Sequence, residues 1–502
     1  MLLVCLLQSL LFIGYARRPS VEDCTMRWFD QPLDHSDPRV GSFKQKYYVC
    51  RAHKTKPKHL FFYTGNESPV EVYVNNTGLM WDSAEEFSAL VVFAEHRFYG
   101  ESFPPDWSLD LHVSESDMLS YLRVASALSD YALLIADLKK SFHLDKTVVF
   151  GGSYGGMLAA RMRIEYPSLV QGAIASSAPV IFSSGLSPRP DPFAFYQRIT
   201  SAMGMQCSTG FKRASELIHS LADSTEGVQK LKSTLRLCPG SPVEAQGIIA
   251  AMQEPWVHLA MGNYGFSSNY IIAALTPRRE EARWPNYPLR VACDGLEKCG
   301  NDHCILEGFR EAAGLWYNAT GSIKCFDFSG ETINSEEYVW GYQYCYEMTF
   351  AFNSGSSADV FAPFQINSSK VSDDCYKKYK VRPDVDRQIK QFGTRDDYSK
   401  ATNIFFANGG VDPWTDYSVN WCSGDSIDEA ESSCSSSVRS FLIADGAHHA
   451  DLMFSLEYDD AADLKQVRIK QRDAIREWLS SDDTIFDDYS IVFGNKAHIV
   501  TV

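Results

Sequence analysis

Three short segments of the chain contain the residue types that nucleophilic catalysis requires. Ser153 lies in a Gly-x-Ser-x-Gly pattern, Asp412 follows far downstream, and His448 and His449 are adjacent near the C-terminus. A serine hydroxyl is a poor nucleophile at neutral pH, so it needs a base, and the base needs a carboxylate that orients it. These residues therefore predict a nucleophilic serine with either histidine as its base.

Each of these side chains follows a predicted strand. The serine lies between an apolar strand at 147–150 and a predicted helix, which is the arrangement of a nucleophile elbow, where small neighbours permit a strained turn. Asp412 comes soon after a strand at 403–407, and the two histidines follow a strand at 438–444. Three strand ends thus supply Ser, Asp and His in the order typical of α/β-hydrolases.

Each segment also has a simpler interpretation. The Gly-x-Ser-x-Gly pattern alone fits a plain glycine-rich turn, and an Asp before a Pro is common in turns. The histidine pair alone fits a surface loop or a metal site. Because all three segments occur together at strand ends, the catalytic interpretation is favoured.

The order of predicted elements indicates one sheet with a long insertion. Continuous apolar runs predict buried strands, and the helical segments between them indicate a parallel sheet covered on both faces. The predicted strands are 60–63, 90–94, 147–150, 172–175, 403–407 and 438–444, and the predicted helices are 119–142, 154–166 and 463–480. Residues 182–399 lose this rhythm and contain eight cysteines, so we expect a core at 17–181 and 400–502 with an inserted domain at 182–399.

Composition indicates a folded protein of the secretory pathway. Of 502 residues, 45% are hydrophobic and 22% charged, which excludes wholesale disorder. A net charge of −16 disfavours binding to nucleic acid or to anionic membranes. Residues 2–13 form a short apolar run, so we expect a signal peptide at 1–16 that is cleaved after Ala16. No later apolar run reaches membrane length, so no membrane span is expected.

The cysteines and glycosylation sequons agree with that compartment. Cys5 lies in the expected signal, which leaves twelve of 13 cysteines in the mature chain. Short spacings favour local disulfides, while the remaining connectivity stays open, and without repeated Cys-x-x-Cys spacing no metal site is expected. The close pairs are Cys24 with Cys50, Cys299 with Cys304, and Cys422 with Cys434. Sequons occur at Asn66, Asn75, Asn318 and Asn367.

Several longer segments resemble one serine peptidase family, the family of lysosomal Pro-X carboxypeptidase and dipeptidyl peptidase 2. The similar segments are 29–35, 62–67, 93–102, 151–157, 340–347, 408–414 and 446–449. The resemblance implies an α/β-hydrolase core with an inserted helical, disulfide-bonded cap domain. It also implies cleavage beside proline at the end of a peptide, in a reaction that needs no cofactor. Because relatives commonly dimerise, a homodimer is one possible assembly.

The resemblance assigns roles to the catalytic candidates. Ser153 resembles the nucleophile, Asp412 the orienting acid and His448 the base. His449 is less favoured as the base and is assigned to substrate binding instead. The backbone N–H of Tyr154 resembles one donor of the oxyanion hole.

Further positions are assigned to the oxyanion hole and to proline recognition. The second oxyanion donor is expected around Gly65 and Asn66, and Met157, Met348 and Trp414 resemble the positions of an apolar pocket for proline. Because a glycan on Asn66 would obstruct this site, we predict that its sequon is unoccupied, with glycans on the other three.

Three other functions stay open. Dipeptidyl peptidase activity, which releases N-terminal X-Pro dipeptides, would need an acidic side chain to bind the substrate amine. The residue after Trp340 is Gly341, not an acid, which disfavours this activity. Segments 76–82 and 256–261 are more similar to the carboxypeptidase. A lipase or esterase is disfavoured because no HGGG-type segment exists. A catalytically inactive binding protein is disfavoured because all three catalytic candidates are present.

One departure from the family concerns the histidine loop. The family continues Leu-Asp-Leu-Arg after the second histidine, whereas this chain continues from Ala450 to Met453. The missing arginine removes a support that the loop would otherwise have.

Overall fold

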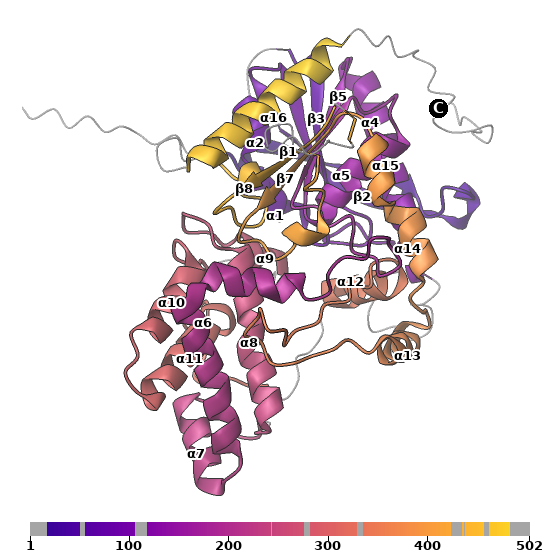
Figure 1. The fold of residues 1–502 in the computed structure, drawn as a ribbon. Helices are drawn as coiled ribbons and strands as arrows, with labels where there is room; N and C mark the ends of the chain where they lie inside the picture. Colours follow the sequence, from indigo (N-terminus) through magenta and orange to yellow (C-terminus); the bar gives the residue numbers. More distant parts are fainter. Residues whose placement is uncertain are drawn as a thin grey trace, which may run out of the picture.

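Eight strands form one mixed sheet, the centre of the computed structural model (Figure 1). The structure describes residues 18–50, 56–105, 118–241, 243–275, 282–328, 335–422, 434–435, 437–455 and 461–481. The strands are β1 (Cys24–Pro32), β2 (Ser42–Cys50), β3 (His59–Thr64), β4 (Ala89–Ala94), β5 (Thr147–Gly152), β6 (Gly172–Ser176), β7 (Ile404–Gly409) and β8 (Val438–Ile443). Their order is β1-β2-β4-β3-β5-β6-β7-β8. The expected signal peptide lies outside the described residues.

The six predicted strands form the parallel part of this sheet. From β4 through β3, β5, β6 and β7 to β8, every neighbouring pair is parallel, and β3, β4, β5, β6 and β7 are buried along their whole length. Full burial explains why these strands are continuous apolar runs. The parallel strands place the residues that follow them at one edge of the sheet, which is where the catalytic candidates occur.

The sheet is mixed rather than parallel throughout, because β1 and β2 extend it in antiparallel fashion. The sequence pattern did not predict these two strands. Most residues of β1 are exposed or half-buried, and charged side chains interrupt both strands, so neither forms an apolar run. The Cys24–Cys50 disulfide joins the paired ends of the two strands.

Helices cover both faces of the sheet (Figure 1). They are α1 (Val70–Val74), α2 (Leu79–Ala84), α4 (Val124–Phe142), α5 (Tyr154–Glu165) and α16 (Ala462–Ser480). In α4, Leu128, Tyr131, Ile135 and Leu138 are buried at helical spacing, which gives the helix one face toward the sheet. The predicted helix began at residue 119, but α4 begins only at Val124, because the backbone of Arg123 is extended, with φ −134° and ψ 145°. The carbonyl of Tyr121, just before it, accepts a hydrogen bond from the buried Arg97.

A buried ion pair connects several segments that carried the family resemblance. Arg97 donates to both carboxylate oxygens of Asp130, at 2.6 and 2.7 Å, and both side chains are fully buried. His35 contacts the same carboxylate at 2.7 Å, and Arg97 also donates to the carbonyl of Leu33 at 3.0 Å. This network joins the end of the β1–β2 hairpin to α4.

The insertion between β6 and β7 is helical, as the resemblance implied, and its larger part projects from one end of the sheet (Figure 1). Its helices are α6 (Ala194–Ala222), α7 (Thr225–Thr234), α8 (Ala245–Met261), α9 (Tyr270–Leu275), α10 (Pro288–Glu297), α11 (Asp302–Tyr317), α12 (Ser335–Tyr346), α13 (Ser368–Tyr379), α14 (Val385–Phe392) and α15 (Arg395–Lys400). This arrangement is an α/β-hydrolase core with an inserted cap. None of the helices in the described part of the chain is long and apolar enough to cross a membrane.

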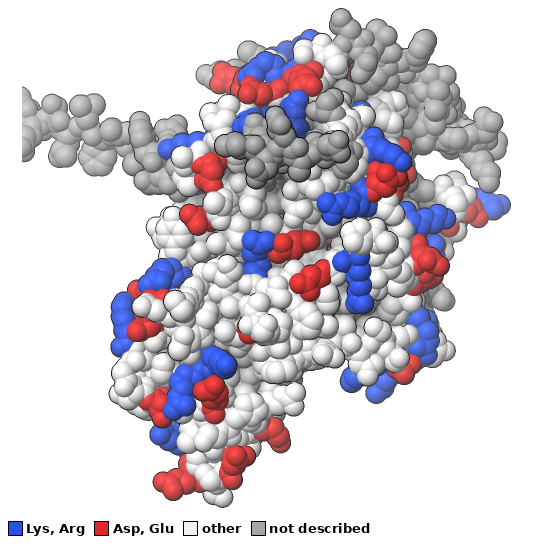
Figure 2. All heavy atoms as spheres, in the orientation of Figure 1, with Lys and Arg blue, Asp and Glu red and all other residues white. Residues whose placement is uncertain are grey.

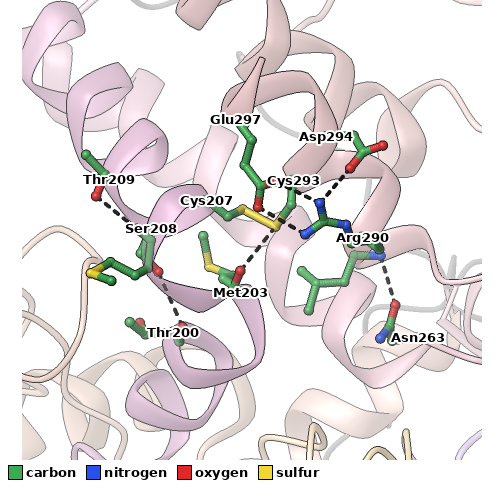
Figure 3. Close-up of a disulfide and its surroundings, with 12 residues drawn as sticks. Thr200, Met203, Cys207, Ser208, Thr209, Asn263, Arg290, Cys293, Asp294 and Glu297 are labelled. Carbon is green, nitrogen blue, oxygen red and sulfur yellow. Dashed lines mark hydrogen bonds and ion pairs between the residues drawn. A yellow bond between two sulfur atoms is a disulfide. The ribbon is translucent and has the colours of Figure 1, made fainter. Parts of the chain in front are cut away.

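Six disulfides use all twelve cysteines that follow Cys5. The three expected local pairs are confirmed. The other three join distant parts of the insertion and are Cys207–Cys293, Cys238–Cys325 and Cys345–Cys375. Figure 3 shows the first of these, which joins α6 to α10 beside Arg290 and its ion-pair partners Asp294 and Glu297.

Acidic and basic side chains are interspersed on the face of the molecule that Figure 2 shows. Many of them form ion pairs along one helix, such as Lys370 with Asp374 at 2.6 Å. On this face, the described residues therefore form no large patch of one charge that would attract a polyelectrolyte.

Candidate active site

Ser153 occupies a strained turn between β5 and α5. Its φ of 56° and ψ of −127° are unusual for a residue with a side chain. A Cβ atom on Gly151 would lie 2.1 Å from the carbonyl oxygen of Gly155, so the turn requires the small residues of the pattern. This geometry is that of a nucleophile elbow, in which the serine oxygen projects beyond the end of the sheet.

The end of β6 holds both the elbow and the histidine loop. The N–H of Ser153 donates to the carbonyl of Ser176 at 2.9 Å. The hydroxyl of the next residue, Ser177, accepts from the N–H of His449 at 2.9 Å. A Cβ atom on Gly152 would lie 2.7 Å from the His449 ring, so the elbow and the histidine loop are in direct contact.

Asp412 and His448 form a buried hydrogen-bonded pair. Oδ2 of Asp412 lies 2.7 Å from Nδ1 of His448, and the two residues are 0% and 1% exposed. Because a carboxylate can only accept, Nδ1 donates, which leaves Nε2 with its lone pair. No described residue forms a hydrogen bond with this Nε2 atom. It is therefore available to take a proton, and the hydrogen bond to a nucleophile often forms only when substrate is bound.

The insertion holds the backbone of His448. The N–H of His448 donates to the carbonyl of Met261 at the end of α8, at 3.0 Å. Its carbonyl accepts from the hydroxyl of Tyr264 at 2.7 Å. The cap therefore positions the histidine directly, a role of Tyr264 that the sequence pattern did not reveal.

Arg468 of α16 supports the turn after the histidines. It is 5% exposed and donates to the carbonyls of Ala450, Asp451 and Met453 at 3.1, 3.1 and 2.9 Å. The loop thus has an arginine support although Met453 stands where the family has arginine. The sequence contained a signal for it, since Arg468 shares a helical face with the buried Ile475, two turns further along.

The proposed oxyanion loop lies directly beside the elbow. Tyr154 is the first residue of α5, so its N–H has no partner within the helix and points out of the helix end. Asn66 donates from Nδ2 to the carbonyl of Gly152 at 2.6 Å, and the carbonyl of Gly65 accepts from Tyr131 at 3.0 Å. Asn66 therefore supports the elbow through its side chain, and the next residue, Glu67, lines a pocket together with Ser153.

This pocket has a volume of about 550 Å³ and lies between the core and the insertion. Met157 and Trp414, which were assigned to proline recognition, line it from the core. Most of its wall comes from apolar and aromatic side chains, including Val257, Met261, Trp340, Tyr344, Phe350 and Phe352. Such walls suit a small apolar ring of a substrate.

Two further residues assigned to substrate recognition, Met348 and His449, lie elsewhere. Met348 is fully buried, and neither it nor His449 is among the described residues that line the pocket. The His449 ring packs beneath Gly152 and edge-on to Tyr270, with ring centroids 5.2 Å apart. Burial lowers the pKa of His449 well below its ordinary value, and the neighbouring His448 adds to this effect, so the ring is neutral.

The four sequons differ in exposure. Asn75 and Asn367 are exposed, and Asn318 is half-buried. Asn66 is 1% exposed, and its amide nitrogen is already bonded to the elbow. A glycan could not be attached there without opening the site, which supports the prediction that Asn66 is unmodified.

Comparisons with known proteins agree with this arrangement. Residues 31–471 match the family described as serine carboxypeptidase S28. Lysosomal Pro-X carboxypeptidase of Pongo abelii is 34% identical over 90% of this chain and 88% of its own length. The human protein of the same name is 35% identical over 85% of this chain and 82% of its own length.

A solved structure, brefeldin A esterase, covers 91% of this chain and 78% of its own at 12% identity, but its TM-score of 0.31 is too low to support an argument. The family match spans most of the chain, and the relatives span nearly all of it. The chain therefore belongs to the serine carboxypeptidase S28 family of serine-type exopeptidases.

Proposed function

We propose that this protein is a carboxypeptidase that removes the C-terminal residue following a proline. The observation that carries the proposal is the buried Asp412–His448 pair, held beside a strained serine elbow that opens into an aromatic pocket. The relatives named lysosomal Pro-X carboxypeptidase support this choice among the activities of the family.

In the proposed mechanism, Nε2 of His448 takes the proton of the Ser153 hydroxyl while Oγ attacks the carbonyl carbon of the proline. Asp412 stabilises the imidazolium that results, and the N–H of Tyr154 donates to the oxyanion, with a second donor from the Gly65–Asn66 loop. His448 then gives its proton to the leaving amine, which departs as the C-terminal amino acid. Water, activated by the same histidine, hydrolyses the acyl-enzyme and restores Ser153.

The pocket gives a physical reason for proline selectivity. A pyrrolidine ring is compact and apolar, so flat aromatic walls can enclose it without an unsatisfied polar group. Trp414 is held by neighbouring rings, at 5.1 Å from Phe195 and 5.0 Å from Phe350, measured between ring centroids. A wall fixed in this way loses little side-chain entropy when substrate binds.

The proposed compartment is the lysosome or the extracellular space. Six disulfides indicate an oxidising environment, and the similarity to a lysosomal protein agrees with the secretory pathway. We propose N-glycans at Asn75, Asn318 and Asn367.

Product analysis on two peptides tests the proposed function. An N-terminally blocked Pro-Phe peptide should release free phenylalanine, and Ser153→Ala should abolish this release. A peptide with a free amine and proline at its second position tests the dipeptidyl alternative. Release of an N-terminal dipeptide without any cleavage of the blocked peptide would contradict the proposal, and no cleavage of either would favour a binding protein.

A further inference from the structure

A carboxyl group that the proposed mechanism does not use lies beside the nucleophile. Glu67 follows the loop that supports the elbow and lines the same pocket as Ser153 and Tyr154. Its Oε2 atom is buried and has no hydrogen-bond partner among the described residues. An unpartnered buried carboxyl oxygen is costly, so its presence at the reacting centre calls for a function.

The surroundings of Glu67 contain little positive charge. Burial raises the pKa of Glu67 above its ordinary value. It outweighs the backbone N–H of Glu67, the nearby His448 and the side chain of Asn66, which all favour the ionised carboxylate. The titratable groups that face Glu67 from the elements around it are Tyr63, Tyr73, Tyr154, Tyr270 and His448. Burial raises the pKa of each tyrosine, so those four are neutral.

A carboxypeptidase must also bind the α-carboxylate of the residue that it releases. The described lining of the pocket contains no lysine or arginine, and its basic residue is His258. Nε2 of His258 is 3.9 Å from Glu254, and the ring stacks on Trp316 with centroids 4.0 Å apart. Nδ1 of His258 is buried and, like Oε2 of Glu67, has no hydrogen-bond partner among the described residues. Three side chains of the described lining thus have an unpartnered buried polar atom, namely Glu67, His258 and Trp414. Of these, Glu67 is the residue whose neighbour, Asn66, bonds the elbow.

We propose that Glu67, in its protonated form, donates a hydrogen bond to the α-carboxylate of the C-terminal residue of the substrate. An O–H···O⁻ bond between a carboxylic acid and a carboxylate is short and strong, and it requires no cation in the pocket. The same proton would be lost at higher pH, and the ionised Glu67 would then repel the substrate carboxylate. Glu67 is thus a specificity-determining residue, an inference that rests on the proposed carboxypeptidase function.

The sign of the pH dependence follows from this assignment. As pH rises through the raised pKa of Glu67, the protonated fraction falls, so the preference for a free C-terminal carboxylate falls with it. A substrate whose C-terminus is an amide has no carboxylate to recognise and should not share this loss. Since His448 acts on both substrates alike, the ratio of their kcat/KM values isolates the effect of Glu67.

The experiment compares an N-terminally blocked Pro-Phe peptide with its C-terminal amide between pH 4.5 and 7.5. For the wild type, the ratio of kcat/KM for acid over amide should fall by about 10- to 100-fold across this range, as expected for one hydrogen bond to a charged group. In Glu67→Gln, whose amide donates at every pH, the ratio should stay high and nearly constant. In Glu67→Ala the ratio should be low throughout.

Activity on the amide substrate shows in each case that the variant is folded. Glu337→Gln removes the other carboxyl that the described pocket lining contains, and it should keep the wild-type pH profile of the ratio. If Glu67→Gln shows the same fall in ratio as the wild type, the inference is overturned while the proposed function stands. If the wild type cleaves neither blocked peptide, the proposed function itself fails, and the inference fails with it.

Discussion

Replacing Asp412 by asparagine should nearly abolish catalysis while leaving the fold intact. Oδ1 of Asp412 accepts from the N–H of Trp414 at 3.1 Å, and an asparagine carbonyl can keep this bond. Its NH₂ group would then face Nδ1 of His448, where Oδ2 now lies at 2.7 Å. An amide N–H can only donate, so Nδ1 would have to accept, and the ring proton would move to Nε2. His448 could then no longer take a proton from Ser153.

The size of the expected loss of kcat follows from two effects, the loss of the correct tautomer of His448 and the loss of the charge that stabilises its imidazolium. In serine proteases the equivalent change lowers kcat about ten-thousand-fold, which corresponds to about 5 kcal/mol of transition-state stabilisation. We expect a loss of this size because Asp412 and His448 are almost fully buried, so solvent cannot replace the carboxylate. The melting temperature should change by only a few degrees, because the shape of the side chain is preserved.

The assay is the release of phenylalanine from the blocked Pro-Phe peptide, with kcat referred to protein verified as folded by circular dichroism. Asp416→Asn is the matched control, since Asp416 lies one turn further along the same loop and pairs with Arg198 at 2.7 Å instead of a histidine. It should change kcat by less than about threefold, as expected for a partly exposed ion pair. A kcat for Asp412→Asn within tenfold of the wild type would refute this account of the histidine's orientation.

Three further predictions follow from buried groups around the site. Arg468→Met should lower the free energy of unfolding by about 3 kcal/mol, because buried carbonyls lose their donor, and should lower kcat more than it raises KM. Arg468→Lys should restore part of the free energy of unfolding, measured by denaturant titration, and part of kcat, measured by steady-state kinetics. Burial raises the pKa of Glu347 to about 7, so the unfolded chain ionises this group first as pH rises from about 4.5. Between about pH 4.5 and pH 7, the wild type should therefore lose about 3 kcal/mol of stability relative to Glu347→Gln. If the difference in melting temperature between the two proteins is the same at both of these pH values, this expectation is wrong. Peptide mass spectrometry should find glycans on Asn75, Asn318 and Asn367 and none on Asn66, whereas a glycan on Asn66 of active enzyme would contradict the loop assignment.

The parts of the fold that could be predicted from the sequence are those specified by local apolar patterns. The parallel strands are mostly continuous apolar runs, and all six were predicted, as was the presence of a helical insertion. Strands β1 and β2 escaped prediction because neither is a continuous apolar run. Most residues of β1 are exposed or half-buried, and the hairpin carries charges such as Lys44 and Asp30, which pair across the strands at 2.7 Å. The local disulfides could be expected from short loops, but Cys207–Cys293 depends on how α6 and α10 pack.

In the candidate site, too, some residues could be predicted from local sequence and others could not. Ser153, Asp412 and His448 could be singled out because each follows a strand, and parallel strands end at one edge of the sheet. The groups that hold them come from distant elements, such as Tyr264 from the insertion and Arg468 from the last helix. Their contacts are with backbone carbonyls, which leave no trace in the sequence of the loop that is held. The helical face of Arg468 indicates its burial, but the carbonyls that Arg468 and Tyr264 contact can be identified only from the packed structure.

The most direct test of the central claim is the identification of the residue that forms the acyl-enzyme. A fluorophosphonate reacts only with a serine that has been activated by a base, and peptide mapping by mass spectrometry locates the adduct. We expect a single adduct on Ser153, formed rapidly in the wild type and at least a thousandfold more slowly in His448→Ala, in line with the loss of a general base. An adduct on another residue, or equal labelling rates in the two proteins, would contradict this expectation.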